Sequence, residues 1–419
     1  MDDLPSTSCE TAGLFRRSAL SWCEGRLDIG LQFAEAAVDV DCADNHEFCE
    51  VSPFWHVALL IKAREIEAAW RALHALDACG HAAAAESPGP PQSSRSPRMV
   101  ATAHVFRGEL LFVTGHAEEG LAEVSTGLRI AERHGVRSLR PTGYVVLALA
   151  ALRRADMRAC LAFVDKLAGE ALLGYFGQAA GAWVTAQATE ARSGVDSAAG
   201  LIAGIVTSPL VLRQLLVSEP GAASWLVRAC GMLGAHELAT TAAAVAASVA
   251  AAHPRFTVLR AAALHATGLI EGDVATLLEA ANLYPDQWCA ASAREDLAGV
   301  LAKRPTERGA TVLALETALT AYTAVGATRD ASRVVNRLRE LGVRRGTVRT
   351  GDRERARPNG LTNTEFAVAE LVSQGHTNNE VGRQLFISRH TVAFHLKKVY
   401  QKMSVTSRVE LAASWKAMR

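Results

Sequence analysis

The chain has 419 residues, of which 49% are hydrophobic and only 6% aromatic. This length allows more than one folding unit, and the composition favours helices packed through Ala, Leu and Val. Eight scattered cysteines without a CxxC pair, and a start without a signal-peptide pattern, argue against a secreted disulfide protein. The most apolar windows, 198–212 and 238–252, are too short to span a bilayer. We therefore expect a reduced cytoplasmic protein that has no transmembrane segment and does not bind membranes.

Charge is distributed unevenly along the chain. The formal net charge is +1, but residues 344–419 carry 14 Lys and Arg against 6 Asp and Glu, a net of +8. The preceding residues carry 30 basic against 37 acidic side chains, a net of −7. A basic tail on an acidic body is typical of a protein whose one end meets nucleic acid.

A repeated pattern of apolar helix, tight turn and amphipathic helix fills residues 1–343. The expected turns lie at Gly25, near Ala63, and at Gly115, Asp156, Gly194, Gly234, Gly272 and Pro305. From Gly115 onwards the steps are 33 to 41 residues, within the range of helix-pair repeats. Residues 108–127 loosely resemble the tetratricopeptide (TPR) pattern. We predict about eight hairpins stacked into a TPR-like superhelix, which would offer a surface to an unknown protein, peptide or small-molecule effector.

Two segments interrupt the helical pattern. The Pro/Ser-rich stretch 86–98 cannot continue a helix and is predicted to be a mobile surface loop. Residues 344–360 contain six arginines together with Gly and Pro, and they read as a linker. The arginines of this linker either form a solvated tether or also touch phosphates, and the sequence leaves both interpretations open.

Residues 361–419 predict four short helices, near 363–373, 378–385, 389–403 and 408–418. Three of them begin with a capping box, in which a Ser or Thr precedes a Glu by three residues. The pairs are Thr362 with Glu365, Thr377 with Glu380, and Ser407 with Glu410. Only three residues separate the second helix from the third, which is the arrangement of a helix-turn-helix.

The third of these helices has two unlike sides at 100° per residue. One side carries Val392, Leu396, Val399 and Met403, together with Ile387 just before the helix. These residues should pack on Phe366, Val372, Val381 and Leu385. The opposite side carries His390, Phe394, Lys397 and Gln401, flanked by Arg389, Thr391, Lys398 and Lys402. Taken alone, this cationic stripe fits either a solvated surface or a helix that reads bases and phosphates in the major groove.

Residues 361–412 closely resemble the DNA-binding domain of LuxR-type bacterial transcription regulators. The matching positions are Leu361, Thr362, Glu365, Gly375, Thr377, Asn378, Glu380, Val381, Leu385, Ile387, Ser388, Thr391, Val392, His395, Lys402, Arg408 and Glu410. The resemblance implies that the third helix enters the major groove of promoter DNA, with Ala393, Phe394 and Lys397 towards the bases. It places Arg389, Thr391, His395 and Lys398 nearer the backbone, and Asn378 is a further candidate DNA-binding residue. It also implies a homodimer formed through the last helix, for which Val409, Ala412, Ala413 and Lys416 are the candidate residues.

Residues 260–345 more weakly resemble the end of the helical-repeat half of large ATP-binding LuxR regulators. The chain contains no Gly-Lys pair, so the phosphate-binding G-x-x-x-x-G-K-[ST] loop is missing. Cys42, His46 and Cys49 fit no common zinc spacing. We therefore expect no catalytic residues, cofactor or metal, and hence no enzyme.

These patterns together predict a DNA-binding transcription regulator controlled through its repeat body, with RNA polymerase as a candidate partner. Two alternatives remain. One is an interaction scaffold with a degenerate helix-turn-helix, suggested by Ala393, which offers no hydrogen bond. The other is a partner-dependent fragment of an ATP-binding regulator.

Overall fold

The computed structural model of the chain describes residues 9–40, 47–85, 96–170, 177–343, 361, 363–384 and 389–417. The chain divides into two compact units, Met1–Gly342 and Val343–Arg419. Every regular element in the described ranges is a helix, so the predicted all-α fold is confirmed. The predicted linker 344–360 and most of the predicted loop 86–98 lie outside these ranges. Pro97 and Arg98 belong to a helix, which corrects the end predicted for that loop.

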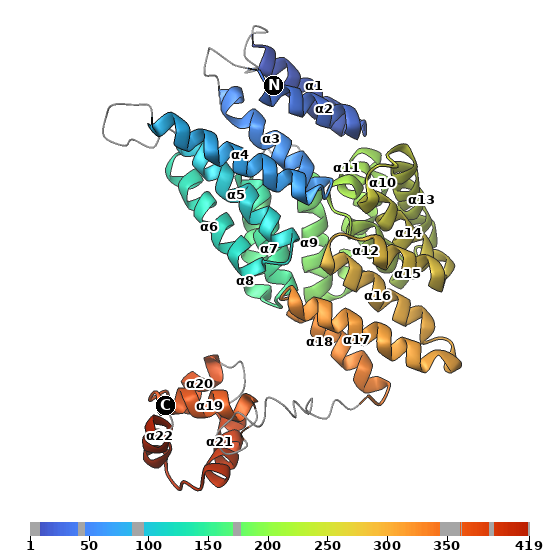
Figure 1. Cartoon of the computed structure of the whole chain (residues 1–419). Coiled ribbons are helices and arrows are strands. Elements are labelled where there is room, and N and C mark those ends of the chain that lie inside the picture. The colour runs from blue at the N-terminus through green and yellow to red at the C-terminus, as the bar shows by residue number, and fades with distance from the viewer. Residues whose placement is uncertain are drawn as a thin grey trace. The chain divides into compact units, whose positions relative to one another are not determined.

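The first unit is a TPR-like array of stacked helical hairpins (Figure 1). The hairpins are α1 (Glu10–Cys23) with α2 (Leu27–Val38), α3 (Glu47–Lys62) with α4 (Ile66–Ala85), α5 (Pro97–Val113) with α6 (Ala117–Arg133), α7 (Arg140–Arg153) with α8 (Met157–Ala168), α9 (Gly177–Ser193) with α10 (Val195–Thr207), α12 (Ala222–Met232) with α13 (His236–Ala252), α14 (Thr257–Glu271) with α15 (Val274–Leu283), and α16 (Gln287–Leu301) with α17 (Arg308–Ala324). Two single helices that the repeat pattern did not predict, α11 (Pro209–Ser218) and α18 (Thr328–Glu340), complete the described array. A short 3-10 helix, Pro305–Glu307, forms the last predicted turn.

Most of the predicted turns lie where the chain adopts a left-handed backbone. The exceptions are the turn at Pro305, which is the 3-10 helix, and the turn at Asp156, which is displaced by one residue. Gly115, for example, has φ +94°, a conformation that a side chain disfavours. In the fourth hairpin the left-handed residue is Ala155, with φ +63°, rather than Asp156. Asp156 instead caps α8 by accepting a hydrogen bond from the Ala159 amide at 3.0 Å. The weak turn expected near Ala63 is centred on Arg64, with φ +58°.

Glycines allow the third hairpin to pack with its two backbones in contact. A Cβ atom at Gly108 of α5 would lie 2.6 Å from the Gly120 carbonyl oxygen and 2.8 Å from the Val124 amide nitrogen of α6. A Cβ atom at Gly120 would lie 2.7 Å from the Gly108 carbonyl oxygen. These distances are too short for any side chain, so small residues at this crossing set the spacing of the hairpin.

A buried ionic cluster joins hairpins that are far apart in the sequence. Lys62, the last residue of α3, lies 2.6 Å from a carboxylate oxygen of Glu109 and 3.1 Å from one of Glu219. Arg64 lies 3.8 Å from Glu219 and 3.7 Å from Asp286, the residue that caps α16. These side chains are at most 10% exposed. The second hairpin therefore contacts the segments that precede α12 and α16.

The second unit contains four helices, α19 (Asn363–Ser373), α20 (Asn378–Gln384), α21 (Arg389–Met403) and α22 (Arg408–Ala417). Their ends agree with the predicted ranges to within one residue. The predicted apolar side of α21 is buried, in a core formed by Leu361, Val368, Ala369, Val372, Val381, Val392, Leu396, Val399, Met403, Leu411 and Trp415. Leu385 and Ile387, which were predicted to join it, lie outside the described residues.

The described ranges contain neither a single membrane-spanning helix nor a cluster of metal ligands. None of the described helices is by itself long and apolar enough to cross a bilayer, and α10 with α11 reaches that length only across a 95° bend. In the same ranges no group of three His, Cys, Asp or Glu side chains could hold a metal ion. Cys42 and His46 lie outside the described residues, as does the side chain of Cys49.

Candidate nucleic-acid interface

A reciprocal capping box begins α20, the first helix of the helix-turn-helix. The Thr377 amide donates to the Glu380 carboxylate at 2.7 Å, and the Glu380 amide donates to the Thr377 hydroxyl at 3.3 Å. In α22 the Glu410 amide donates to Ser407 at 3.2 Å, while the Glu410 carboxylate accepts from the Thr406 amide at 2.7 Å. The backbone and then the hydroxyl of Thr406 lower the pKa of Glu410. The predicted pairs thus fix both helix starts locally, although the Glu410 carboxylate accepts from Thr406, which the pattern did not identify. Thr362, of the third predicted capping box, lies outside the described residues.

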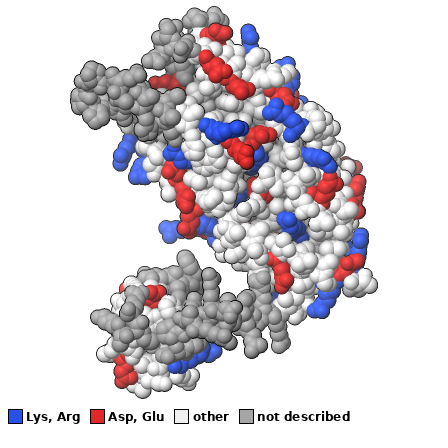
Figure 2. All heavy atoms as spheres, viewed as in Figure 1, with Lys and Arg blue, Asp and Glu red and all other residues white. Residues whose placement is uncertain are grey.

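The outward side of α21 is basic. Its exposed side chains are Arg389, Ala393, Lys397, Lys398, Gln401 and Lys402, and His395 is half-buried. The side chains of His390, Thr391 and Phe394 lie outside the described ones, so the predicted exposure of Phe394 stays a prediction. In Figure 2 the described basic side chains of this unit gather along one edge, apart from its acidic ones. The described part of the predicted stripe therefore carries several exposed cationic side chains, which attract phosphates.

Lys402, at one margin of the stripe, also has an internal partner. Its ammonium nitrogen lies 2.6 Å from a carboxylate oxygen of Glu365, on α19. The Glu365 side chain is 4% exposed and that of Lys402 is 37% exposed. The capping pattern assigned Glu365 to its own helix start, and nothing in the spacing indicated this pair. Lys402 therefore connects the predicted recognition helix to the buried Glu365 of α19. The predicted contact of Lys402 with DNA stays a prediction.

Asn378 is likewise engaged within the domain. Its side-chain oxygen accepts a hydrogen bond from Arg408 at 3.2 Å, and Arg408 also donates to the His376 carbonyl. Arg408 thereby joins the start of α22 to the turn before α20. In the sequence, the only signal for this role was that Arg408 matched the LuxR-type pattern.

Two of the candidate dimer residues, Val409 and Ala413, lie on α22 opposite its core contacts. Leu411 and Trp415 are buried, and the Trp415 ring lies 5.0 Å from that of Phe366. Val409 is 79% exposed, Ala413 is exposed and Ala412 is half-buried, whereas the Lys416 side chain lies outside the described ones. An exposed valine beside small residues is a surface that a second copy of the helix can cover.

Comparison with known proteins agrees with this geometry. Residues 359–414 match the luxR family of bacterial regulatory proteins. An HTH-type transcriptional regulator of Mycobacterium tuberculosis is 45% identical over 65 residues, which cover 15% of this chain and 7% of that protein. The transcriptional regulatory protein LiaR of Bacillus subtilis is 34% identical over 83 residues, 20% of this chain and 34% of LiaR. The C-terminal segment is therefore a LuxR-family helix-turn-helix domain.

The chain spans only about 7% of the length of the mycobacterial relatives and 34% of the length of LiaR. Among solved structures, a Rap protein complexed with competence and sporulation factor aligns with 80% of this chain and 97% of its own, at 10% identity and a TM-score of 0.44. The curated relatives are transcriptional regulators, and they support a DNA-binding regulator.

Proposed function

We propose that this protein is a transcription regulator of a bacterial cytoplasm that inserts α21 into the major groove of promoter DNA. The observation that carries the proposal is the exposed cationic side of α21 within a LuxR-family helix-turn-helix domain. Lys397 lies at the centre of that side and donates to guanine or to phosphate, while Gln401 and Arg389 extend the contact in both directions. We further propose that two copies bind together through α22, because its outward side is apolar around Val409.

In this proposal the repeat body regulates DNA binding by the C-terminal domain. Stacked hairpins form an extended surface for partners, and the linker connects this surface to the DNA-binding domain. An effector protein, peptide or small molecule bound there would change how much of the protein engages DNA. RNA polymerase is a second proposed partner, since a promoter-bound regulator lies next to it.

One specific observation favours a scaffold function instead. Ala393 is exposed at a position that the LuxR resemblance turns towards the bases, and it has no hydrogen-bonding group. We nevertheless favour DNA binding, because Lys397, Lys398 and Gln401 remain exposed beside it and because DNA shape also contributes to specificity.

A genomic selection tests the proposal. The full-length chain is incubated with fragmented source DNA at near-physiological salt, alone and with the dialysable fraction of the source cells, and the bound DNA is sequenced. Enriched promoter fragments with a two-fold motif support a dimeric regulator. Enrichment only with the dialysable fraction supports a small effector, and no enrichment under either condition would overturn the proposal in favour of a scaffold.

Lys397 gives the corresponding residue-level prediction. Lys397→Ala should weaken binding to an enriched fragment by about 1 to 3 kcal/mol. If Lys397 contacts a phosphate, the dependence of log Kd on log salt should also fall by about one. The matched control is Lys303→Ala on the repeat body, where Lys303 is also exposed. Equal affinities of the two variants across a salt series would remove Lys397 from the interface.

A further inference from the structure

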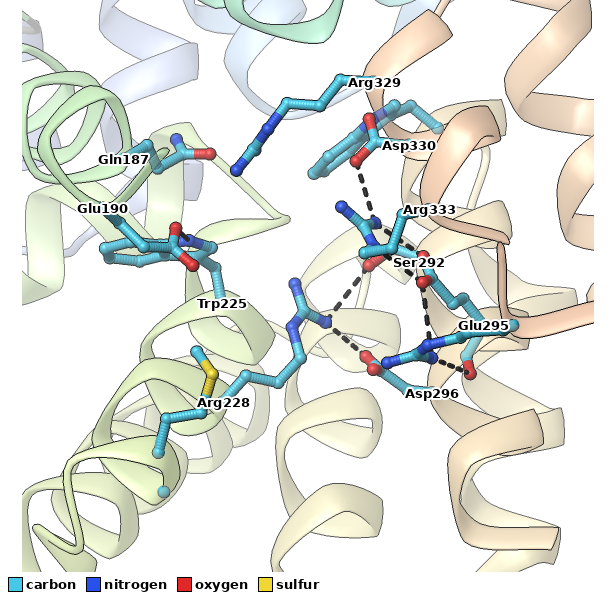
Figure 3. Close-up of a pocket in the computed structure, with 14 residues that line it drawn as sticks. Gln187, Glu190, Trp225, Arg228, Ser292, Glu295, Asp296, Arg329, Asp330 and Arg333 are labelled. Atoms are coloured by element: carbon cyan, nitrogen blue, oxygen red, sulfur yellow. Dashed lines mark hydrogen bonds and ion pairs between the residues drawn. The ribbon is translucent and has the colours of Figure 1, made fainter. Parts of the chain in front are cut away.

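A cavity of about 470 Å³ opens on the repeat body between helices of separate hairpins. Its walls come from α9, α12, α16 and the single helix α18, so they combine residues up to 150 positions apart, from Gln187 to Arg337. Figure 3 shows polar side chains from these helices converging on one space. A volume of this size fits a small organic ligand.

Two of the four carboxylates around the cavity are held by the same arginine. Glu295 accepts from Arg333 through both of its oxygens, each at 2.7 Å. Asp330 accepts from the indole nitrogen of Trp288 at 2.9 Å and lies 2.9 Å from Arg333. These acidic groups are therefore already paired with protein donors, as Figure 3 shows for the ion pairs of Arg333.

The other two carboxylates also have protein donors. Asp296 forms an ion pair with Arg228 and accepts from His265 at 2.8 Å. Glu190 accepts from the indole nitrogen of Trp225 at 3.0 Å. Each lining carboxylate thus already accepts from at least one protein donor. None of these four carboxylates therefore needs a cationic ligand as its partner.

The groups left without partners are donors. Arg329 lines the cavity but makes no hydrogen bond or ion pair with the described residues, and its side chain extends into the open space (Figure 3). Gln187 is 6% exposed, and its Nε2 is buried with no hydrogen-bond partner among the described residues. Figure 3 shows its amide on the same side of the cavity as Arg329. A buried donor without an acceptor is unfavourable, so a ligand that supplies acceptor atoms here gains their pairing energy.

Apolar groups complete the cavity. Trp225, Trp288 and Met232 line it, and Met232 is 61% exposed. The Trp288 ring is fixed by Arg153, whose guanidinium lies 4.1 Å from the ring centroid, and by its hydrogen bond to Asp330. A rigid aromatic wall beside unpaired donors suits a molecule with an apolar body and an anionic end.

We propose that this cavity binds a small organic carboxylate, whose oxygens accept hydrogen bonds from Arg329 and Gln187 while its apolar part packs on Trp225, Trp288 and Met232. A planar carboxylate matches the paired N–H groups of a guanidinium. The same chemistry is offered by a free organic acid and by the C-terminal carboxylate of a short peptide. Binding of a carboxylate to the cavity requires no DNA and is independent of the proposed function. Only the role of the cavity as the effector site of the repeat body rests on the proposed function.

The test measures binding of defined acids to the full-length chain by isothermal titration calorimetry. The free acids are benzoate, phenylacetate, 4-phenylbutyrate, octanoate and N-acetylphenylalanine, and the peptide arm is Gly-Leu-Phe. Each is compared with its primary amide, which keeps the shape and loses the charge. We expect at least one acid to bind about tenfold or more tightly than its amide, because charge-assisted hydrogen bonds are the stronger ones.

Variants tie the binding to the cavity. Arg329→Gln should weaken the acid about 10- to 100-fold, and Gln187→Leu about 5- to 10-fold. Arg192→Gln is the matched control, since Arg192 is exposed on α9 and does not line the cavity. Thermal melting establishes that each variant is folded. The proposal is overturned if no acid of either arm binds below about 10 mM, if acids and amides bind equally, or if Arg329→Gln leaves the affinity unchanged.

A second readout separates this site from the proposed function. The affinity for an enriched promoter fragment is measured with and without a saturating concentration of the acid that binds. A change in DNA affinity that Arg329→Gln abolishes supports an effector role. Acid binding with unchanged DNA affinity keeps the site and overturns its effector role. Acid binding by a chain that binds no promoter DNA keeps the site and overturns the proposed function instead.

Discussion

Replacing Lys402 with methionine should destabilise the C-terminal unit. Methionine keeps most of the apolar stem of lysine but removes the ammonium group that lies 2.6 Å from the Glu365 carboxylate. Loss of one partner of a fully buried pair costs about 3 to 5 kcal/mol. Because the Lys402 side chain is 37% exposed, water screens part of this interaction, and we expect a loss of about 1 to 3 kcal/mol.

Hydrogen exchange read by mass spectrometry on the full-length chain measures this loss for α19 and α21 separately from the repeat body. Glu365→Gln supplies the second arm of a double-mutant cycle. Glu365→Gln removes the buried charge, so the double variant should be less destabilised than the sum of the single ones, with a coupling energy of about 1 kcal/mol or more. Lys397→Met is the control, because Lys397 is an exposed lysine on the same helix and should leave exchange in α19 unchanged.

Two results would refute this reasoning. A coupling energy near zero would show that the pair adds nothing to the stability of the unit. Normal hydrogen exchange in Lys402→Met, together with weakened DNA binding and a lower salt dependence, would make Lys402 a phosphate contact rather than a link to the core.

Four further predictions concern the repeat body and are measured by chemical unfolding of the full-length chain. Gly108→Ala should lower the free energy of unfolding by about 1 to 3 kcal/mol, because its Cβ would press on backbone. Gly204→Ala, in open space on α10, should raise it by up to about 1 kcal/mol. Ala155→Gly should raise it by about 0.5 to 1 kcal/mol, since relief of the left-handed conformation outweighs the entropy of glycine; a loss would contradict the turn geometry. Burial lowers the pKa of His265 in the folded state below its ordinary value of 6.5. As the pH drops below 6.5, His265 is therefore protonated in the unfolded state before it is protonated in the folded state, and the free energy of unfolding should fall. His265→Gln should reduce this slope without abolishing it, because burial also lowers the pKa of His56, and an unchanged slope would contradict the assignment.

The repeat pattern and the helix-turn-helix were predictable because both depend on local rules. Glycines such as Gly115 and Gly272 predict the turn of a hairpin, because glycine readily adopts the left-handed conformation that these turns require. The fourth turn was misplaced by one residue because Ala155 occupies this conformation without the glycine signal. The helices α11 and α18 were missed because the repeat pattern was read as pairs of helices and each of them is an additional helix outside a pair, although α18 follows α17 across a left-handed turn at Gly326.

The candidate sites were predictable to different degrees. The sides of α21 follow from the angle between successive residues, so the buried positions of Val392 and Val399 agreed with the sequence. The pairing of Lys402 with Glu365 crosses 37 residues and follows only from how α19 packs on α21. The cavity around Arg329 was invisible to sequence analysis for the same reason, since its walls come from four helices whose stacking no local pattern specifies.

The buried contacts of Lys62 and Arg64 change how the repeat body should unfold. A solenoid in which each hairpin contacts only its neighbours can fray from either end, one hairpin after another. Here Lys62 is paired with Glu219, 157 positions away, and Arg64 lies beside Asp286. Opening the second hairpin would leave the buried carboxylates of Glu219 and Asp286, beside α12 and α16, without their cationic partners. The loss of these ion pairs would therefore destabilise the middle of the array. The hairpins from α3 to α16 should therefore melt as one cooperative block, with a single transition where a simple solenoid would give several.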